Sequence, residues 1–508
     1  MENTKTDVVV LGAGLAGLSC AHELTKKSSK KVTLVEKNPY SGGLAVTLKK
    51  DNHSFDSGPH RWFTKSEEVD QWLRDLLKEE LVDVNRLTRI YYKGKYYFYP
   101  LKPLNALKNL GIIASTQAIS SYLWVRMQLK LGLRSSKVNN IADAYINQFG
   151  KKLYFEFFHF YTEKLWGRKT TELSGDWASQ RSKGLSIWSA VKDSIIKSKN
   201  VVSLIDKFKY PKTGFGRIAE KMEEDISSIE GNKFLFAQDV KTLNWVQNGS
   251  EMVIESIVVS HTSSSDIHDK NITISNKVIN GNTAPISATT QTLRADNFVS
   301  SIPITELVFR MEPQAPENVI QAAKTLSFRD EIQVTLMINK AHFTPDNWVY
   351  TQDRKLIFVR LMEMDSWTDG LSPNGTTSIV FELACQEGDE TWTKPDSELV
   401  DMVANNYINE FHYFEKENIT GSYVHRVPKE YPVYDIGYKE KVDTIKEYIS
   451  KFSNLQIIGR NGTFKYNNSD HSIQMGLYAA RNIMGEKYDL ENINTDRAYQ
   501  EIKKVNQI

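Results

Sequence analysis

Cysteine is scarce in this chain: Cys20 and Cys385 are the only two among 508 residues. Two cysteines cannot build a disulfide-rich scaffold, and their scarcity indicates a reducing compartment such as the cytoplasm. The ten histidines are not grouped with cysteines at zinc-ligand spacings, so no metal site is predicted. The formal charge of +2 is nearly balanced, which argues against a nucleic-acid partner.

Long hydrophobic runs are also missing. The most hydrophobic helix candidate, Leu110–Val125, contains several Ser, Thr and Gln side chains. It is too polar and too short to cross a bilayer, which needs about 20 apolar residues. Contact with a membrane surface through this segment stays open. No signal peptide precedes the first motif, so the sequence predicts a cytoplasmic chain without an integral membrane segment.

A strand, a glycine-rich turn, a helix and a second strand begin the chain. The run Asp7–Gly17 reads DVVVLGAGLAG, and a second apolar run, VTLVE, ends at Glu36. Gly12 allows the tight turn, Gly14 lets a pyrophosphate approach the backbone, and Gly17 lets the helix pack against the sheet. The helix N-terminus offers free N–H groups to phosphates, and the acid can bond a ribose hydroxyl. The pattern predicts a dinucleotide site.

A pair of glycines follows the acid, in the run Lys37–Leu44, which reads KNPYSGGL. Taken alone, this run is a glycine-rich surface turn. After a dinucleotide fingerprint, Glu-x5-Gly-Gly resembles the large FAD family that includes amine oxidases, protoporphyrinogen oxidase, phytoene desaturase and UDP-galactopyranose mutase. In that family the loop passes close to the pyrophosphate and the flavin. The resemblance implies FAD rather than NAD, and no Cys or His matches a covalent-flavin position, so the FAD is expected to be non-covalent.

The length predicts two to four domains, which are not consecutive along the chain. The fold class is predicted to be α/β plus α+β, because strands near 297–303 and 455–460 complete the first unit. Residues 1–66, 205–305 and 450–508 are expected to form a Rossmann-like FAD-binding domain. Residues 67–204 are expected to form a mainly helical insertion with a hairpin near 88–102, and residues 306–449 an antiparallel-sheet substrate domain. The stretch 260–270 is interpreted as a long hairpin tip.

Five further segments resemble the UDP-galactopyranose mutase family, in the order in which that family carries them. They are FDSGPH at Phe55–His60, the aromatic helix Leu153–Gly167, LSFRD at Leu326–Asp330, EYPV at Glu430–Val433 and GRNGTFKY at Gly459–Tyr466. Together they span nearly the whole chain.

Other segments depart from the mutase pattern. Phe464 stands where that motif usually has Tyr, and Asn467–His471 replaces a Tyr-Asp-Met-Asp type of run. The stretches Ser301–Glu306 and Asp176–Arg181 look more like the protoporphyrinogen-oxidase side of the superfamily. These departures leave the substrate open.

The resemblance assigns roles to individual residues. It implies that His60 lies against the flavin, and that Arg181, in a predicted loop, and Arg329 bind a substrate diphosphate, with Arg168 a weaker candidate. Substrate-binding residues are expected to be Tyr161, Trp166, Tyr431 and Tyr466. Cofactor-binding residues are expected to be Gly12, Gly14, Leu15, Ala16, Gly17, Glu36, Lys37, Gly43, Leu44, Gly58, Pro59, His60, Val240, Gly459, Arg460 and Asp470.

Each of these residues also has a plain structural interpretation. His60 can be a buried histidine in a turn, and Tyr161 and Trp166 can be ordinary core. Arg329 can pair locally with Asp330. Asp470 can be the N-cap of a helix over Ser472–Ile483, a role compatible with a helix N-terminus that faces the flavin pyrimidine edge.

The resemblance implies a flavoenzyme of the mutase type, in which reduced flavin attacks the anomeric carbon of a nucleotide-diphosphate sugar without net redox. An external reductant such as NAD(P)H would supply the reduced state. The alternative is an FAD-dependent oxidoreductase of the protoporphyrinogen oxidase, amine oxidase or desaturase type. A flavin-binding protein without catalysis is the third class.

Overall fold

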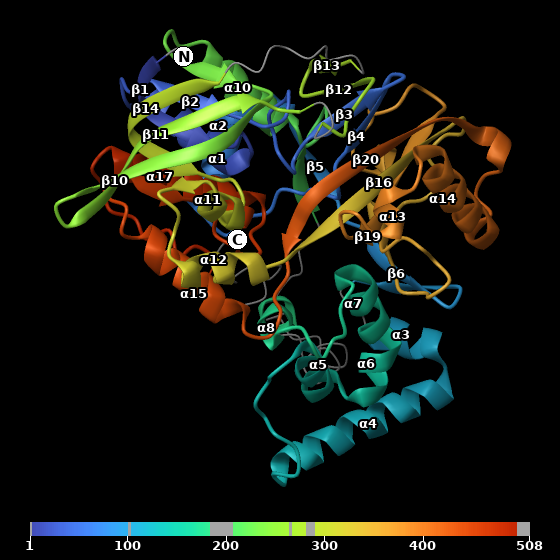
Figure 1. Cartoon of the computed structure of the whole chain (residues 1–508). Helices are drawn as coiled ribbons and strands as arrows, with labels where there is room; N and C mark the ends of the chain where they lie inside the picture. The colour runs from blue at the N-terminus through green and yellow to red at the C-terminus, as the bar shows by residue number, and fades with distance from the viewer. Residues whose placement is uncertain (1–2, 100–102, 183–206, 264–266, 281–289, 495–508) are drawn as a thin grey trace.

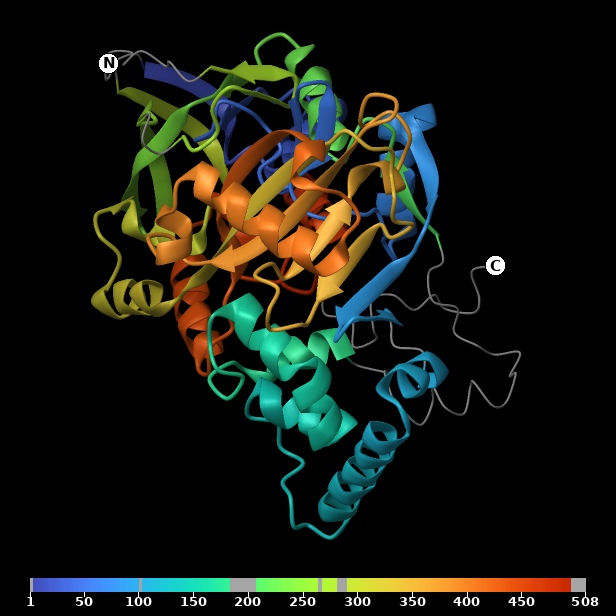
Figure 2. The ribbon, with the colours of Figure 1, turned by 90° about the vertical axis from the view of Figure 1, so that its right-hand side faces the viewer.

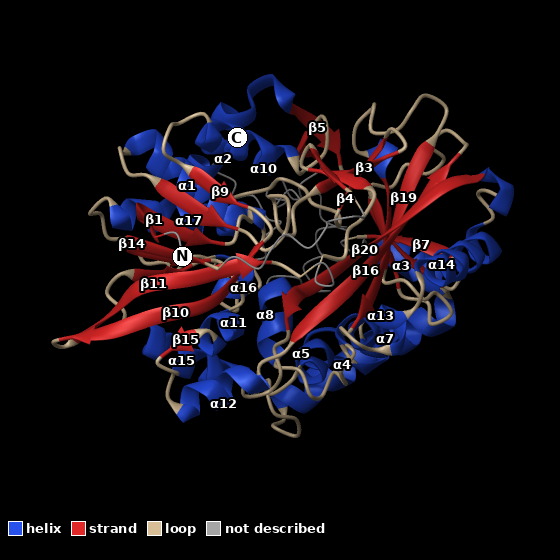
Figure 3. Cartoon of the chain, turned by 45° about the horizontal axis from the view of Figure 1, so that its top comes forward, coloured by secondary structure: helices blue, strands red, loops and turns tan. Residues whose placement is uncertain are grey.

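The structure is a computed structural model, and it describes residues 3–99, 103–182, 207–263, 267–280 and 290–494. Two large sheets stand side by side, and a lobe of helices lies below them (Figure 1). Figure 3 shows the two sheets from above, each with helices packed around it. The mixed α/β class predicted from the sequence is confirmed.

The first sheet has eight strands and a parallel centre. β1 (Asn3–Leu11) lies between β2 and β14 and is parallel to both. Its run Val8–Leu11 is fully buried, which is typical of a central parallel strand covered on both faces. The order is β15 (Met311–Glu312), β10 (Gln238–Asn248), β11 (Glu251–His261), β14 (Gln291–Ser300), β1, β2 (Val32–Val35) and β9 (Lys233–Leu235), and β21 (Leu455–Ile457) pairs with β14.

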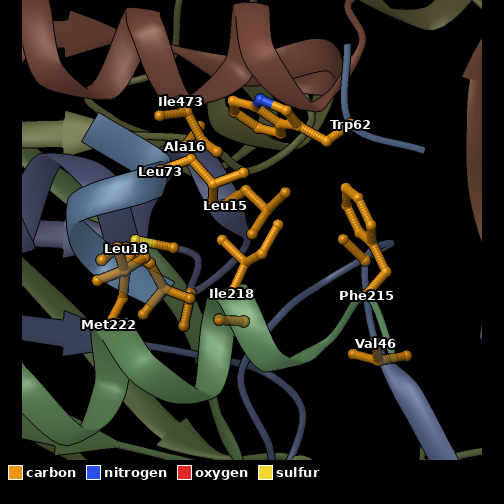
Figure 4. Packing of buried hydrophobic residues seen from close by; sticks show 14 of the residues in the cluster. Leu15, Ala16, Leu18, Val46, Trp62, Leu73, Phe215, Ile218, Met222 and Ile473 are labelled. Atoms are coloured by element: carbon orange, nitrogen blue, oxygen red, sulfur yellow. The ribbon is translucent and has the colours of Figure 1, made fainter. Parts of the chain in front are cut away.

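Segments far apart in the sequence therefore meet in this sheet. β14 lies beside β1 and β21 lies on the other side of β14, so the predicted strands near 297 and 455 both belong to this sheet. Four helices pack on one another at this sheet, and Figure 4 shows their side chains interlocking. They are α1 (Leu15–Lys27), α2 (Glu67–Leu77), α10 (Arg217–Ser227) and α17 (Ser469–Ile483). The opposite face of the sheet is covered by α11 (Ile304–Phe309), α12 (Glu317–Thr325) and α15 (Tyr438–Ile449), and the short α16 (Gly459–Gly462) precedes α17.

The second sheet has seven strands. Strand β16 is buried along its whole length, between the edge strand β20 and β19. α14 (Asp396–Phe411) covers one face through a common apolar cluster, and α13 (Glu390–Thr393) precedes it. The order is β20 (Ile419–Pro432), β16 (Phe328–Ile338), β19 (Thr377–Cys385), β18 (Arg360–Glu363), β17 (Trp348–Thr351), β6 (Thr88–Tyr92) and β7 (Lys95–Phe98).

Smaller elements connect the two sheets. A four-stranded sheet joins β13 (Lys277–Ile279), β12 (Ile272–Ile274), β3 (Thr47–Lys50) and β4 (His53–Asp56). A two-stranded sheet joins β5 (Leu81–Asn85) and β8 (Lys207–Pro211). Single 3-10 turns occur at η1 (Lys78–Glu80), η3 (Met364–Ser366) and η4 (Lys416–Asn418).

The helical lobe lies at the bottom of Figures 1 and 2. Its helices are α3 (Pro103–Leu110), α4 (Ile112–Lys130), α5 (Ile141–Phe149), α6 (Lys151–Phe157), α7 (His159–Trp166) and α8 (Gly175–Ser182). Within the described ranges, no helix combines the length and the apolar character that crossing a membrane would need.

Several segments lie elsewhere than the predicted domains place them, among them α12 and α15, which pack against the first sheet. The hairpin β6–β7 pairs with β17 and so extends the seven-stranded sheet instead of belonging to the helical insertion. Helix α2 packs beside α10 and α17 on the nucleotide side. β15 pairs with β10 in the first sheet, not in the second. Local patterning could not assign these partners, because strand pairing is decided by tertiary packing.

Candidate functional site

The glycine-rich turn after β1 has the geometry that its residues require. Gly12 has φ +94°, and a Cβ placed on it would lie 2.4 Å from Ser301 Oγ. A Cβ on Gly17 would lie 2.0 Å from the carbonyl oxygen of Gly12. A side chain at Gly12 would collide with Ser301, and one at Gly17 would push helix α1 away from the turn and from β1. Gly17 therefore acts through packing, and the groove described below is lined by the other two fingerprint glycines.

The two glycine motifs of the sequence lie against each other. The Gly42 N–H donates to the Ala13 carbonyl at 2.8 Å, and a Cβ on Gly43 would lie 3.1 Å from Gly14 Cα. Gly14 is the N-cap of α1, and a Cβ there would meet only Gly43 Cα, at 3.9 Å. The space in front of the helix N-terminus is thus free for a ligand that contacts backbone N–H groups.

Glu36 ends β2 and is held by backbone donors. Its Oε2 accepts from Ala13 N at 2.7 Å, and its Oε1 accepts from Asn38 N at 2.9 Å. Burial raises the pKa of this carboxyl, and the two N–H bonds act in the opposite direction. The acid and the turn of α1 are therefore fixed to each other before any ligand binds.

These elements form one wall of a groove between the two sheets, with a volume of about 480 Å³, within the range of ligand sites. The opposite wall comes from β20, at His425–Lys429, and the far end from Gly459 and the start of α17. The predicted cofactor residues that line it are Gly12, Gly14, Leu15, Ala16, Glu36, Lys37, Gly43, Leu44, His60, Val240, Gly459 and Arg460.

A second cavity of about 160 Å³ adjoins the groove. His60, Arg460, Asn468 and Ser469 line both spaces, so the two meet there. Gly58, Pro59 and Asp470, predicted to bind cofactor, line only this second cavity. Its other walls are aromatic or cationic side chains, with one further acid: Arg61, Phe63, Tyr99, Trp348, Tyr350, Arg360, Glu430, Tyr431 and Tyr466.

His60 stands at the junction in a fixed orientation. Its ring stacks on Phe215, with 5.1 Å between ring centroids and 23° between planes. Its Nε2 lies 2.9 Å from the Leu44 carbonyl, which can only accept, so Nε2 carries the proton. Burial, together with the charge of Arg460, lowers the pKa of this imidazole to about 4. His60 is therefore neutral at physiological pH, and its other nitrogen has no proton.

Arg460 and two tyrosines form one face of the second cavity. The rings of Tyr431 and Tyr466 are stacked, 5.3 Å apart and 6° from parallel. The guanidinium carbon of Arg460 lies 5.0 Å and 5.4 Å from their centroids. Arg460 also donates from Nε to the Asn467 carbonyl at 2.9 Å, and from Nη1 to the Glu430 carbonyl at 3.1 Å. Arg460, predicted to bind cofactor, and Tyr431 and Tyr466, predicted to bind substrate, thus lie in contact with one another.

Buried carboxylates beneath this cavity are functional candidates that sequence reasoning missed. Arg360 is paired with Glu382 through two hydrogen bonds, the longer at 2.7 Å. Glu331 and Glu430 lie in the same network, and burial raises the pKa of both carboxyls. For Glu331, the neighbouring carboxylates add to this shift. The residues come from different strands of one sheet, so no local sequence motif marks them.

A second missed cluster lies in the wall of the groove. The Asp269 carboxylate accepts from Tyr40 at 2.7 Å and from Tyr423 at 2.9 Å, and it pairs with His425 Nδ1 at 2.7 Å. Asp269 is buried, so the prediction of a hairpin tip over 260–270 is wrong. The long hairpin turns instead at Gly249, between β10 and β11. The Ser/Thr-rich composition of this stretch is typical of a surface turn. The burial of Asp269 depends on tertiary contacts with Tyr40, Tyr423 and His425, which the local sequence does not indicate.

The aromatic helix does not reach the cavities as predicted. Trp166 is buried in the core, edge-on to Trp177, and lines neither space. Tyr161 packs edge-on against Tyr350, which itself lines the second cavity. Trp166 also packs edge-on against Tyr431, so both predicted residues lie behind an aromatic wall of the second cavity.

Arg329 makes structural contacts and lines neither the groove nor the second cavity. Its guanidinium donates to the carbonyls of Leu165 at 2.8 Å, Ala384 at 3.0 Å and Lys164 at 3.4 Å. Two of these carbonyls belong to the last turn of α7, where a cation stabilises the helix end. A local pair with Asp330 is also wrong, because Asp330 accepts from the N–H groups of Lys429 and Glu387.

The remaining predicted residues also differ in detail. Arg181 lies in α8, a helix instead of the predicted loop, and its side chain is outside the described part of the structure. Arg168 is exposed, two residues past α7. Helix α17 begins at Ser469, and its N-cap is Asn468 in a reciprocal capping pair with His471. Asp470 is thus in the first turn, not the N-cap.

Comparison with known proteins supports the fold. Residues 10–79 match the family model for an NAD(P)-binding Rossmann-like domain. Coproporphyrinogen III oxidase of Bacillus subtilis (strain 168) is 30% identical over 106 residues, which is 20% of this chain and 23% of that enzyme. The chain thus matches less than a quarter of this curated relative's length.

Solved structures are similar over almost the whole chain. Reduced UDP-galactopyranose mutase superimposes with a TM-score of 0.76 over 98% of this chain and 99% of its own, at 17% identity. A candidate protoporphyrinogen oxidase from Exiguobacterium sp. 255-15 superimposes with a TM-score of 0.68 over 95% and 99%, at 14% identity. The chain therefore carries a Rossmann-like dinucleotide-binding domain within the fold shared by UDP-galactopyranose mutase and protoporphyrinogen oxidase-like proteins.

Proposed function

We propose that the groove binds FAD non-covalently and that the protein is a flavoenzyme. Three features of the groove fit this dinucleotide. Glu36 lies at one end for a ribose, and Gly14 and Gly43 leave backbone space for a pyrophosphate in the middle. Gly459 and the first turn of α17 lie at the other end, where a helix N-terminus stabilises negative charge on a ring.

The continuation of the groove into a second space favours FAD over NAD. His60 and Arg460 line both the groove and the second cavity, so a ring bound between them would face a separate chamber. A bound flavin would supply a nucleophilic nitrogen when reduced, or would accept hydride when oxidised. The residues of the chain would orient both partners and exclude water.

The observation that carries the substrate proposal is the composition of that chamber. It contains three arginines and six aromatic rings, with Glu430 and Asp470 as its only acids. Planar guanidinium groups suit phosphate oxygens, and aromatic faces suit a base or a sugar. A nucleotide-diphosphate sugar fits this chemistry, so we propose a mutase-like isomerase that uses reduced flavin. Arg61, Arg360 and Arg460 are the proposed anion ligands, in place of Arg329, which lines neither space.

His60 would act in this site as a neutral ring of fixed tautomer. Its Nε2–H is committed to the Leu44 carbonyl, and its stacking on Phe215 sets the ring plane. A neutral imidazole beside a flavin adds no positive charge that would hold electrons on the ring.

The alternative is an FAD-dependent oxidoreductase. The specific observation in its favour is the buried set Glu331, Glu382 and Glu430, which holds more carboxylates than the two arginines beside it can neutralise. Carboxyls with raised pKa values are suited to proton transfer that accompanies hydride transfer. The match to coproporphyrinogen III oxidase is the second support. In both cases we propose a cytoplasmic enzyme, consistent with Cys20 and Cys385, which are buried and unbridged.

The two functions differ in net electron flow, which an anaerobic experiment measures. The purified holoenzyme is reduced with dithionite and mixed with a panel of nucleotide-diphosphate hexoses. A mutase should form the ring-isomerised sugar while the flavin stays reduced, and the oxidised enzyme should be inactive. Stoichiometric bleaching of oxidised flavin by a substrate, without any isomer, would refute the mutase and support the oxidoreductase.

A further inference from the structure

Helix α4 and the residues that follow it expose large apolar side chains to solvent. Nine of the fifteen exposed large apolar side chains in the described part of the chain lie within residues 112–138. Their exposed fractions run from 38% to 86%. They are Ile112, Ile113, Ile119, Leu123, Trp124, Met127, Leu131, Leu133 and Val138.

The inward face of the same helix carries little apolar volume. The buried residues of α4 are Ser115, Ala118 and Val125. The helix approaches α6 closely, since a Cβ on Gly150 would lie 2.7 Å from Tyr122 Cα. An ordinary surface helix has the opposite arrangement, with its large apolar residues toward the core. Packing within the described chain therefore does not explain the outward residues.

Five of the outward residues lie on one side of the helix, with the exposed polar residues Thr116 and Ser120 among them, and we call these five the stripe. Ile112, Ile119, Leu123, Met127 and Leu131 follow each other at spacings of seven and four, which places them on one side of an α-helix. Figures 1 and 2, taken from directions 90° apart, both show α4 at the outer edge of the helical lobe, away from the two sheets. The stripe is thus accessible to a large, flat partner.

The charge around the stripe has one sign. No Asp or Glu occurs between Asp83 and Asp143, whereas ten Lys and Arg residues do. Four of these cations flank the stripe, are exposed, and have no carboxylate of the described residues within ion-pair distance: Lys108, Arg126, Lys130 and Lys137. Arg134, the fifth in this region, pairs with Asp143 at 3.3 Å.

We infer that α4 is an interfacial helix that inserts its apolar stripe into the headgroup region of an anionic lipid bilayer. An exposed apolar helix with Trp among its large residues and unpaired cations at its borders has the composition of such helices. A protein partner would not require an acid-free segment of this length, whereas an anionic surface attracts each nearby cation. The helix would lie in the interface plane, and the groove and cavity would remain outside the bilayer.

The test is vesicle flotation of the full-length holoenzyme. Vesicles of phosphatidylcholine with about 30% phosphatidylglycerol are compared with pure phosphatidylcholine, at low and high salt. The first variant combines Ile113→Gln, Leu123→Gln and Trp124→Gln. Its matched control combines Ile229→Gln, Val278→Gln and Ile436→Gln, three side chains of similar exposure, 43% to 68%, outside the helical lobe.

The inference predicts binding to the anionic vesicles that falls at least tenfold in the α4 variant and is unchanged in the control. A separate Arg126→Gln/Lys130→Gln variant should lose several-fold in binding to anionic vesicles and show a weaker salt dependence. Flavin content and melting temperature should match wild type in all variants, which separates lost binding from misfolding.

Two outcomes would overturn the inference. One is the absence of vesicle binding by wild type at low salt. The other is an oligomer in solution, measured by light scattering without lipid, that the α4 variant dissociates and the control does not. That second result would assign the stripe to contact with another copy of the chain.

Discussion

The imidazole of His60 stacks on the ring of Phe215, 5.1 Å between centroids, and Asp56 fixes the backbone of that phenylalanine. The Asp56 carboxylate accepts from Phe215 N at 3.0 Å, from Thr47 at 2.6 Å and from Tyr210 at 2.5 Å. Asp56 thus sets the ring plane of His60 indirectly. It holds Phe215, which lies 159 positions further along the chain, and Phe215 stacks on His60.

Phe215→Leu should keep the fold and lower turnover, because an apolar side chain remains but the stacking surface for His60 is lost. We expect a several-fold fall in kcat at unchanged flavin content. The His60 pKa, measured by NMR of the imidazole, should rise toward its ordinary value of 6.5. Phe234→Leu is the control, since Phe234, in the edge strand β9, stacks on Phe236 and makes no ring contact with His60. Equal effects of both changes on kcat and on the His60 pKa would remove the positioning role of Phe215.

Acid should destabilise the protein partly through His60. Its pKa is lowered from 6.5 to about 4 in the folded state, so between these values the unfolded chain binds more protons. The stability contributed by neutral His60 is therefore complete above about pH 6.5 and lost as the pH falls through about 4. The maximum loss is about 3 kcal/mol.

The carboxyl of Asp56 acts in the opposite direction, because burial raises its pKa to about 6. The difference between wild type and His60→Gln isolates the histidine. Urea unfolding between about pH 7.5 and pH 4 should show a steeper loss in wild type than in the variant. Parallel curves for the two proteins would contradict a lowered His60 pKa.

Gly14→Val should give folded protein without flavin. The side chain would enter the space in front of the α1 N-terminus, where a Cβ at this position would have no atom except Gly43 Cα within 4 Å. The added atoms therefore meet ligand instead of protein. Flavin absorbance and released FAD measure occupancy, circular dichroism checks folding, and Gly14→Ala should have an intermediate effect. Full occupancy in Gly14→Val would place the cofactor elsewhere.

Alanine substitutions of Arg329 and Arg61 should have different effects, the first on folding stability and the second on substrate binding. Arg329→Ala leaves the carbonyls of Leu165 and Ala384 without their buried donor and should cost about 1–3 kcal/mol of folding free energy. Substrate affinity of the folded fraction should stay near wild type. Arg61→Ala, in the second cavity, should raise the substrate dissociation constant roughly ten- to a hundredfold with little change in melting temperature. The reverse assignment of effects would restore Arg329 as the ligand.

The sequence alone determined the nucleotide half of the site. A φ of +94° at Gly12 and the absence of room for a Cβ at Gly17 are requirements of a local turn, and local turns leave a readable glycine spacing. The acid at Glu36 was readable for the same reason, since it ends the next strand. The buried strands β14 and β21 were visible as short apolar runs, and a parallel sheet requires such runs.

Only the tertiary structure decided the substrate half. Arg329 and Trp166 have the residue types of ligands, yet packing turns one toward helix carbonyls and the other into the core. Arg360, Glu382 and Glu331 meet because β18, β19 and β16 are neighbours in one sheet, although they lie on separate segments of the chain. Composition and spacing record what a residue can bind. The direction in which its side chain points depends on contacts between distant segments, and no local pattern encodes those contacts.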